Sequence, residues 1–401
     1  MNYLLTGAEF NNKGAEAMAL VALKNIYDYD KNAVIYTIFF GKYPEFTLKN
    51  NIHFFEVSTY QIESMLGNFS KYFIKERLKD FVKAFIPGKK SYFWKYKTAK
   101  SILKSIDVMI DISGFSFSSK WGDGDTVEFS NKILLLNKHG ARVYLMPQSF
   151  GPYDYKDENV LQYGLNALKK CNKIYAREKI GYESLIKFGL TNVEYCPDSV
   201  LIERNFNPFV LLKTNEPIKE IQFNSEHNVA IIPNYRLIDK GGYNVDRLLN
   251  LYRAIVVRLL RDYKVYLIAH AGEDLDICKM IKALFADVNN VILIDYVMIS
   301  FNYEIACKNF DFIIGSRYHA IVHAYKQCTP ALVLGWADKY QDITSLVKQD
   351  CYLLDYTDTN RVIQSLMKME KSYRKEKEVI KENLNLIQQY NCYKVLQEMR
   401  K

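Results

Sequence analysis

The sequence predicts an α/β protein of two doubly wound, Rossmann-like domains that face each other across a cleft. Short apolar runs alternate with helix-length amphipathic segments along the chain, as they do when helices cover a parallel sheet. Runs such as residues 108–112 are apolar on both faces, which is typical of a central parallel strand. The length of 401 residues exceeds what one hydrophobic core usually supports, so two such domains are expected.

The first half of the chain contains six predicted strands with helical patterns between them. The strands are 2–6, 33–38, 52–57, 108–112, 142–146 and 173–176. The helices are 15–27, 127–139, 158–170 and 180–188. Residues 58–103 are less regular, aromatic and basic, and they predict a helical insertion that packs on the first domain. The alternative is a surface that faces an acceptor or an anionic membrane.

The second half repeats the alternation. Its predicted strands are 229–232, 264–268, 291–294, 312–314, 331–334 and 352–354. Its predicted helices are 245–262, 275–285, 303–309, 320–326 and 340–347. Pro and Asn gather between the halves without clean periodicity, as in a linker. The predicted division is a first domain at 1–204 with the insertion at about 58–103, a linker region at 205–228, a second domain at 229–358 and a helical tail at 359–401.

The composition is that of an ordinary globular protein, with 49% apolar and 25% charged residues. Dense basic runs are few, so the net charge of +9 does not indicate a nucleic-acid groove. Seven Cys without a CxxC pair indicate reduced thiols rather than a disulfide frame or a zinc site. The opening residues lack the basic and apolar regions of a signal peptide, and no run of about 18 apolar residues occurs. A cytoplasmic protein is therefore expected.

Ligands of open α/β sheets bind at the carboxyl ends of the strands, so the residues that follow each strand are the candidates for a site. In the first such loop, Gly7 and Gly14 let the backbone approach a ligand, and the helix start offers free amides to an anion. Asn12 and Glu16 are the polar residues beside them. The loop is neither GxGxxG nor a Walker loop, so a dinucleotide is not indicated. A plain turn is the alternative reading.

Two further loops of the first half carry polar groups. Asp111, at the end of strand 108–112, can orient a hydroxyl or accept its proton, although a carboxylate there can also stabilise a turn. Gln148 and Ser149 follow strand 142–146 in a loop stiffened by Pro and Gly. They are neutral groups suited to sugar or phosphate oxygens.

Arg177 directly follows the strand 173–176 and should lie near the cleft. An Arg there can bind a carboxylate or a phosphate with two parallel hydrogen bonds. The structural alternative is an ion pair with Glu178 or Glu183.

The strongest signal is Gly315-Ser316-Arg317-Tyr318-His319, between a buried strand and a helix. Arg317 and His319 should stand at the helix N-terminus, where an anionic donor and a titratable proton carrier belong together. A packed core histidine is the alternative.

Two other histidines could belong to the site. His319 and His323 share one helix face at a spacing that can bind zinc, but no acidic or Cys partner accompanies them, so no metal is expected. His270 follows the strand 264–268 and is the second candidate histidine.

These loops together resemble the polysaccharide pyruvyl transferase family over nearly the whole chain. The resemblance rests on the order and spacing of several motifs. They are Gly7…Asn12-Lys13-Gly14-Ala15-Glu16, Pro147-Gln148-Ser149-Phe150-Gly151-Pro152, Arg177-Glu178…Tyr182-Glu183-Ser184-Leu185…Gly189, Pro197-Asp198 and Gly315-Ser316-Arg317-Tyr318-His319. Ala15 departs from the family, which often has Asp at this position, and a carboxylate role there falls to Glu16 or to none.

The resemblance implies a glycosyltransferase-B-like fold and an enzyme that takes the pyruvyl group of phosphoenolpyruvate. The acceptor would be a hexose or hexosamine of a cell-surface polysaccharide or its precursor, and the product a pyruvate ketal across two hydroxyls. Arg317 and His319 would be catalytic, and no cofactor is expected beside the donor substrate. The donor residues expected are Arg177, Arg317, Gly315, Ser316 and His270, and those lining the cleft or the acceptor are Asn12, Gly14, Glu16, Asp111, Gln148, Ser149 and Asp198.

Two other functions stay open from the sequence. One is a nucleotide-sugar glycosyltransferase of the same architecture, and the other is a non-catalytic glycan-binding or assembly protein. The acceptor could be lipid-linked, nucleotide-linked or polymeric. A lipid-linked acceptor would place the enzyme at the inner face of the cytoplasmic membrane.

Overall fold

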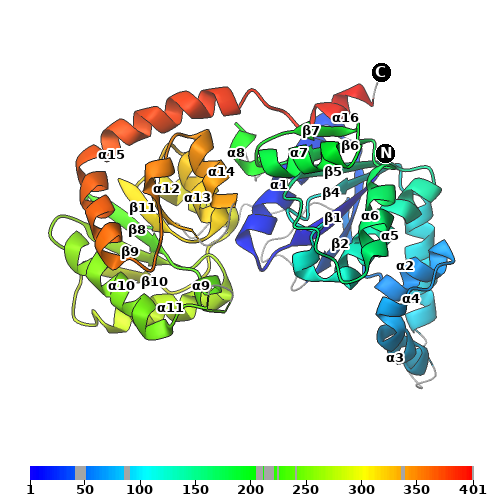
Figure 1. Ribbon diagram of the computed structural model, residues 1–401, viewed down its shortest axis with the longest axis horizontal. Helices are drawn as coiled ribbons and strands as arrows, with labels where there is room; N and C mark the ends of the chain where they lie inside the picture. Colours follow the sequence, from blue (N-terminus) through cyan, green and yellow to red (C-terminus); the bar gives the residue numbers. More distant parts are fainter. Residues whose placement is uncertain are drawn as a thin grey trace.

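The computed structural model of the chain describes residues 1–40, 51–84, 91–204, 211, 221–223, 225–239, 242–335 and 339–399. Most of the predicted linker region, 205–228, lies outside the described residues. The chain forms two parallel sheets covered by helices, which is the predicted fold class (Figure 1).

The first sheet has seven strands in the order β3-β2-β1-β4-β5-β6-β7, and every pairing is parallel. The strands are β1 (Asn2–Glu9), β2 (Val34–Phe40), β3 (Ile52–Phe54), β4 (Val108–Asp111), β5 (Arg142–Gln148), β6 (Lys173–Ala176) and β7 (Val193–Tyr195). The central strand β4 is buried along its whole length, as its apolar run predicts.

The second sheet has six parallel strands in the order β10-β9-β8-β11-β12-β13. They are β8 (Asn228–Ile232), β9 (Lys264–Ile268), β10 (Val291–Ile294), β11 (Phe312–Gly315), β12 (Ala331–Leu334) and β13 (Leu353–Leu354). In each sheet the strand order reverses beside the first strand, at β1/β4 and at β8/β11. These two reversals are the positions where doubly wound sheets bind ligands.

Helices connect the strands and cover both sheets. In the first half they are α1 (Lys13–Tyr29), α5 (Asp123–Lys138), α6 (Glu158–Leu168), α7 (Lys179–Lys187) and α8 (Ser199–Ile202). In the second half they are α9 (Arg236–Asp239), α10 (Val245–Leu259), α11 (Gly272–Ala283), α12 (Ser300–Cys307), α13 (Tyr318–Lys326) and α14 (Lys339–Leu346). Each predicted helix is present. The strand β7 and the short helices α8 and α9 are additions that the sequence pattern did not indicate.

The predicted insertion is helical and lies between β3 and β4. It consists of α2 (Thr59–Leu66), α3 (Ile74–Ala84) and α4 (Ser91–Lys104), and it extends from the end of the first half that is farther from the second sheet (Figure 1). A capping box of Ser58 and Gln61 begins α2. Glu63 on α2 accepts a hydrogen bond from Arg77 on α3, which joins the first two helices of the insertion.

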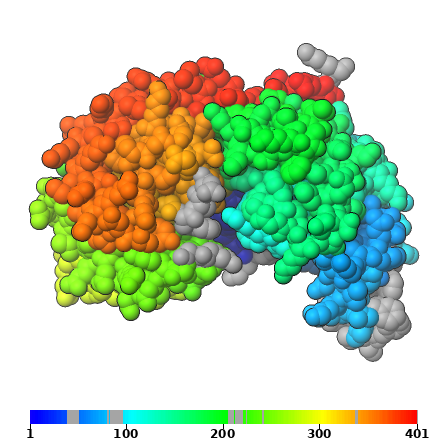
Figure 2. Space-filling model, in the orientation of Figure 1, coloured from blue at the N-terminus to red at the C-terminus, as the bar shows by residue number. Residues whose placement is uncertain are grey.

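The two halves meet through the first helix. Helix α1 contacts α12 and α13 of the second half, and one apolar core continues across the contact. Within it the carboxylate of Glu16 accepts a hydrogen bond from the backbone N–H of Ser300, in the first turn of α12, over 2.7 Å. Figure 2 shows the N-terminal segment, in dark blue, in the hollow between the halves.

The predicted tail is a long helix, α15 (Thr359–Ile387), followed by α16 (Lys394–Glu398). Helix α15 contacts α10 and α14 in the second half and α8 in the first (Figure 1). Beyond it, the tail is held on the first half by the ion pair of Lys394 with Glu194 and by a hydrogen bond from Gln397 to Tyr29. The tail therefore returns to the first domain. No helix among the described residues is long and apolar enough to cross a membrane.

Candidate active site

The candidate site lies where the two strand reversals face each other. Helix α1 follows β1, and helix α13 follows β11, so the first turns of both helices lie at the carboxyl ends of central strands. Asn12 caps α1 by accepting a hydrogen bond from the Gly14 N–H. Arg317 is the residue that precedes α13.

Gly14 lies directly against the ring of His319. A Cβ atom built on Gly14 would be 2.2 Å from Nδ1 of His319 and 2.5 Å from its Cγ, so no larger residue fits while the ring holds this position. The two residues come from opposite halves of the chain. The predicted loop after β1 and the predicted loop after β11 are therefore in direct contact.

His319 also faces Asp198. Its Nε2 lies 3.5 Å from Oδ2 of Asp198, and this nitrogen is buried without a hydrogen-bond partner among the described residues. The side chain of His319 is 13% exposed. Buried polar atoms almost always have a partner, and the carboxylate of Asp198, at ion-pair distance, is the group that faces this nitrogen.

All three nitrogens of the Arg177 guanidinium donate hydrogen bonds to protein side chains, and one of these bonds reaches Asp198. Its Nε donates to Glu178, its Nη1 to Asp198 over 3.0 Å, and its Nη2 to Ser149. The guanidinium also lies over the ring of Tyr318, 4.5 Å from the centroid. This is the ion pair with Glu178 that the sequence left as an alternative. The contacts favour a positioning role for Arg177 over direct contact with a donor.

The charge around Asp198 is set by these neighbours. Burial by itself would raise the pKa of Asp198. The neighbouring His319 ring and the Arg177 guanidinium, together with a hydrogen bond from the Val200 N–H, outweigh burial and hold this pKa well below its usual range. Asp198 is therefore a fixed negative charge that orients both basic side chains.

Arg317 binds two carboxylates at the start of α11. Its Nε and Nη2 donate to the two oxygens of Asp274, over 2.8 and 2.7 Å, and Nη2 also donates to Glu273. Its Nη1 makes no hydrogen bond to the described residues, and the side chain is 15% exposed. One edge of the guanidinium is thus free for an anion, while the other is fixed.

Several other predicted site residues have structural partners. Asp111 is buried and accepts hydrogen bonds from Thr6 and Ser113, and burial raises its pKa. Gln148 donates weakly to Asp111 over 3.4 Å, and its Oε1 is unpaired. Asp111 therefore joins the end of β1 to the loop after β4 by hydrogen bonds, which agrees with the alternative that this carboxylate stabilises a turn.

Glu16, Ser316 and His270 are also buried. Glu16 pairs with Lys13 and burial raises its pKa, so it joins the two halves rather than facing open space. Ser316 follows Gly315 and has an unpaired hydroxyl. His270 packs on Tyr303, and burial holds its pKa well below the usual range. A neutral His270 beside the site can donate or accept a hydrogen bond but not supply a positive charge.

Lys339 is a basic residue of the site that the sequence analysis missed. Its Nζ lies 5.3 Å from the centroid of the Tyr318 ring, which Arg177 also contacts. Burial, then the charge of Arg177, lowers the pKa of Lys339 to about 8. The signal was available, because Lys339 follows the strand β12 at its carboxyl end, where the other candidates also lie.

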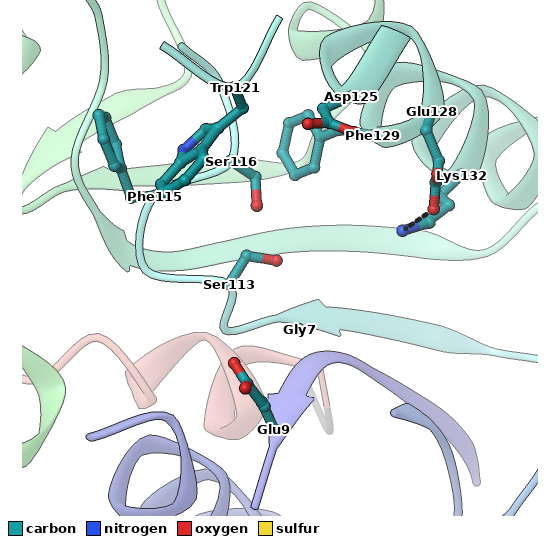
Figure 3. Close-up of a pocket in the computed structure, with 10 residues that line it drawn as sticks. All are labelled: Gly7, Glu9, Ser113, Phe115, Ser116, Trp121, Asp125, Glu128, Phe129 and Lys132. Atoms are coloured by element: carbon teal, nitrogen blue, oxygen red, sulfur yellow. Dashed lines mark ion pairs between the residues drawn. The ribbon is translucent and has the colours of Figure 1, made fainter. Parts of the chain in front are cut away.

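A cavity of about 330 Å³ opens beside the β1/β4 reversal. Figure 3 shows the rings of Phe115 and Trp121 at one end and the ion pair of Glu128 with Lys132 at the other. Glu9, at the end of β1, lies on the side opposite these groups. The remaining lining residues are Gly7, Ser113, Ser116, Asp125 and Phe129. The strand-end rule predicts the loop of this cavity but not its aromatic and acidic side chains.

The comparison with protein families gives one match. The family model described as polysaccharide pyruvyl transferase matches residues 12–338, nearly the whole chain and all five predicted loops except the first residues of the first. No curated protein matches the chain in sequence.

Solved structures show the same fold at low identity. UDP-GlcNAc 2-epimerase from Neisseria meningitidis, bound to UDP-GlcNAc, has 15% identity and a TM-score of 0.56, covering 100% of this chain and 99% of its own. The epimerase from Methanocaldococcus jannaschii has 13% identity and a TM-score of 0.53, covering 92% of each chain. A trehalose-6-phosphate protein from E. coli, bound with UDP-2-fluoro glucose, has 10% identity and a TM-score of 0.52, covering 100% and 98%. These similarities show a glycosyltransferase-B-like fold and do not identify a substrate of this chain.

Proposed function

The chain belongs to the polysaccharide pyruvyl transferase family, and we propose that it transfers the pyruvyl group of phosphoenolpyruvate to two hydroxyls of a sugar, forming a pyruvate ketal. The family makes the protein a transferase with a sugar or polysaccharide acceptor. The donor, the ketal chemistry and the roles of individual residues are part of the proposal. The observation that carries it is the contact of His319 Nε2 with the buried carboxylate of Asp198, 3.5 Å away, in the first turn of α13 beside Arg317.

The charges of the cleft suit the proposed donor. Phosphoenolpyruvate carries a carboxylate and a phosphate, which need fixed cations. Arg317 offers a free guanidinium edge, and Lys339 adds an ammonium near the same helix start. Arg177 acts through Asp198 and Tyr318, which it holds in place.

The proposed reaction needs one side chain, His319, to deliver a proton and to take one back. His319 delivers a proton to the methylene carbon of phosphoenolpyruvate, which becomes the methyl group, and the neighbouring carbon becomes electrophilic. The first sugar hydroxyl attacks this carbon, and its proton returns to His319. The second hydroxyl then attacks the same carbon and displaces phosphate, which leaves with the second proton. Proton transfer by a positioned side chain contributes about 10²–10⁴-fold to rate.

The insertion carries a feature that bears on where the acceptor comes from. Ile74, Leu78 and Val82 repeat every four residues along α3 and are exposed by 50%, 60% and 60%. Lys75 and Lys79 lie on the same helix and are also exposed. Apolar side chains flanked by Lys suit a surface of anionic lipid. We propose that α3 contacts the cytoplasmic membrane, as a lipid-linked acceptor would require.

The proposed donor can be tested before the acceptor is known. The purified protein is titrated with phosphoenolpyruvate, UDP, GDP and CMP, and its thermal unfolding is followed. A ligand at about 100 times its Kd adds about 2.7 kcal/mol of stability. Stabilisation by phosphoenolpyruvate alone, lost in Arg317→Ala, supports pyruvyl transfer. Stabilisation by a nucleotide alone would instead indicate a nucleotide-sugar glycosyltransferase. Phosphate release from phosphoenolpyruvate with a panel of glycans then identifies the acceptor.

A further inference from the structure

The cavity at the β1/β4 reversal differs in chemistry from the basic cleft beside it. It has an exposed aromatic wall, because Trp121 is 52% exposed and meets Phe115 edge to face at 5.6 Å. Flat apolar rings of this kind cover the apolar face of a sugar ring and leave its hydroxyls free to bond elsewhere. The hydroxyls of Ser113 and Ser116 lie between this wall and the far end of the cavity (Figure 3).

The opposite side of the cavity is acidic. Helix α5 presents Asp125, Glu128, Phe129 and Lys132 at helical spacing, so these four side chains share one face. Lys132 neutralises Glu128, whose other oxygen accepts a hydrogen bond from Thr59. The charge of Glu128 is therefore paired, and its oxygens are hydrogen-bonded, within the protein.

Two carboxylates of the cavity have no such partner. Among the described residues, Glu9 and Asp125 receive neither a hydrogen bond nor an ion pair. Burial, with the charge of Glu273, raises the pKa of Glu9, and burial with Glu128 raises that of Asp125. Both groups would gain from a ligand that donates hydrogen bonds, and both would repel an anion.

The acidic side of the cavity lies within electrostatic reach of the second half of the chain. Glu9 feels the charges of Glu273 and Arg236 from the second half of the chain, and Glu273 is a partner of Arg317. At the floor of the cavity Gly7, with a φ of 81°, leaves no room for a Cβ against the Ser113 backbone. The absence of a Cβ at residue 7 thereby lets β1 approach the loop that follows β4.

We propose that this cavity binds the sugar unit that receives the pyruvyl group, and that it selects an uncharged or amino-substituted hexose over an anionic one. The ring stacks on Trp121, and its hydroxyls donate to Glu9 and Asp125. The proposal rests on the proposed function for its acceptor role. It adds the position of the acceptor, the residues that hold it and the class of sugar.

The chain offers a direct probe of the cavity, because Trp121 is one of three Trp residues. Replacing the other two, in Trp94→Phe/Trp336→Phe, leaves Trp121 as the fluorescent reporter. The variant is titrated without donor against the methyl glycosides of glucose, galactose, glucosamine and glucuronic acid. We expect saturable changes with one or more of the first three and at least tenfold weaker binding of the glucuronide. Equal or tighter binding of the glucuronide, or no response to any of the first three, overturns the proposal.

Substitutions separate the acceptor site from the donor site. Trp121→Ala should raise the KM for the acceptor roughly tenfold, Trp121→Phe less, because a smaller ring retains part of the stacking. The double variant Glu9→Gln/Asp125→Asn should reduce the discrimination against the glucuronide. In all three variants the stabilisation by phosphoenolpyruvate should equal that of the wild type. If that stabilisation is absent in the wild type while the glycosides still bind, the proposed donor is wrong and the sugar site stands.

Discussion

Gly14 lies so close to His319 that the ring of His319 fills the position that a side chain at residue 14 would take. The first helix of one half and the helix after β11 in the other half can approach only because residue 14 has no Cβ. This contact fixes the ring from one side while Asp198 faces it from the other. The position of the proposed proton carrier therefore depends on a residue that carries no functional group.

We expect Gly14→Ala to reduce kcat by about 100-fold, because displacement of a catalytic group by about 1 Å has a cost of this size. Turnover with phosphoenolpyruvate and thermal unfolding are measured together. Gly272→Ala is the matched control, since Gly272 also begins a helix and a Cβ there meets nothing within 4 Å. Normal turnover in Gly14→Ala would show that the ring is not the proton carrier in this position.

Asp198 and Glu178 both pair with Arg177, but Asp198 alone of the two also faces His319. Asp198→Asn and Glu178→Gln should therefore lower stability comparably, because each leaves the buried guanidinium with one charge fewer. Asp198→Asn should in addition lower kcat by about 10²-fold or more. Chemical denaturation and initial rates are compared for the two variants. Equal losses of kcat in the two variants would contradict a role of Asp198 in orienting His319.

Arg317 and Arg177 should respond differently to replacement by Lys. Arg317→Lys is expected to raise the KM for phosphoenolpyruvate about tenfold or more, because Lys cannot hold Asp274 with two bonds while offering a planar edge to the donor. Arg177→Lys should mainly lower kcat and the melting temperature, since its nitrogens bind the protein. A larger effect on donor KM from Arg177→Lys would return Arg177 to the donor site, as the sequence first suggested.

His323 gives a dependence of stability on pH. It is buried, both its ring nitrogens are unpaired among the described residues, and burial lowers its pKa to about 3. Below the unfolded value of about 6.5, the unfolded chain binds a proton that the folded chain does not, so stability falls with falling pH by about 1.4 kcal/mol per unit. His323→Leu should lose about 2 kcal/mol less than the wild type between pH 7 and pH 5. Unfolding in urea at the two pH values measures this, and parallel losses would contradict it.

The exposed face of α3 predicts binding to anionic vesicles. Leu78→Glu should weaken sedimentation with phosphatidylglycerol vesicles at least tenfold, because it removes an exposed apolar side chain that the lipid would cover and adds a negative charge that the anionic lipid repels. Ile180→Glu is the control, since Ile180 is a similarly exposed apolar residue on α7. Neither variant should alter binding to phosphatidylcholine vesicles. Comparable losses in both variants would remove α3 as the contact surface.

The sequence predicted the two doubly wound sheets because apolar runs and helical periodicity are local properties of the chain. Strands such as β6 and β9 begin and end at the predicted residues. The strand β7 was missed because its three residues alternate without an apolar run, and it forms by pairing with β6. The helix α8 has four residues, too few for a periodic signal.

The strand-end rule predicts which residues reach the cleft but not which residues they pair with. It brought Gly14 and His319 to one cleft, and the adjacent Glu178 was a foreseeable partner of Arg177. The sequence holds no sign that Ser149 and Asp198 also bind Arg177, because that pairing depends on tertiary distances. Trp121 and Asp125 escaped for a different reason. They lie on a 3₁₀ turn and on α5, several residues beyond the end of β4.

The return of α15 to the first domain has a mechanical consequence. The chain joins the halves twice, once after Arg204 and once beyond Ile387, and Arg204 donates to the carbonyl of Gln388 across the two crossings. The second half is therefore held to the first by the tail as well as by the segment after Arg204. Separation of the halves would require the tail contacts of Lys394 with Glu194 and of Gln397 with Tyr29 to break.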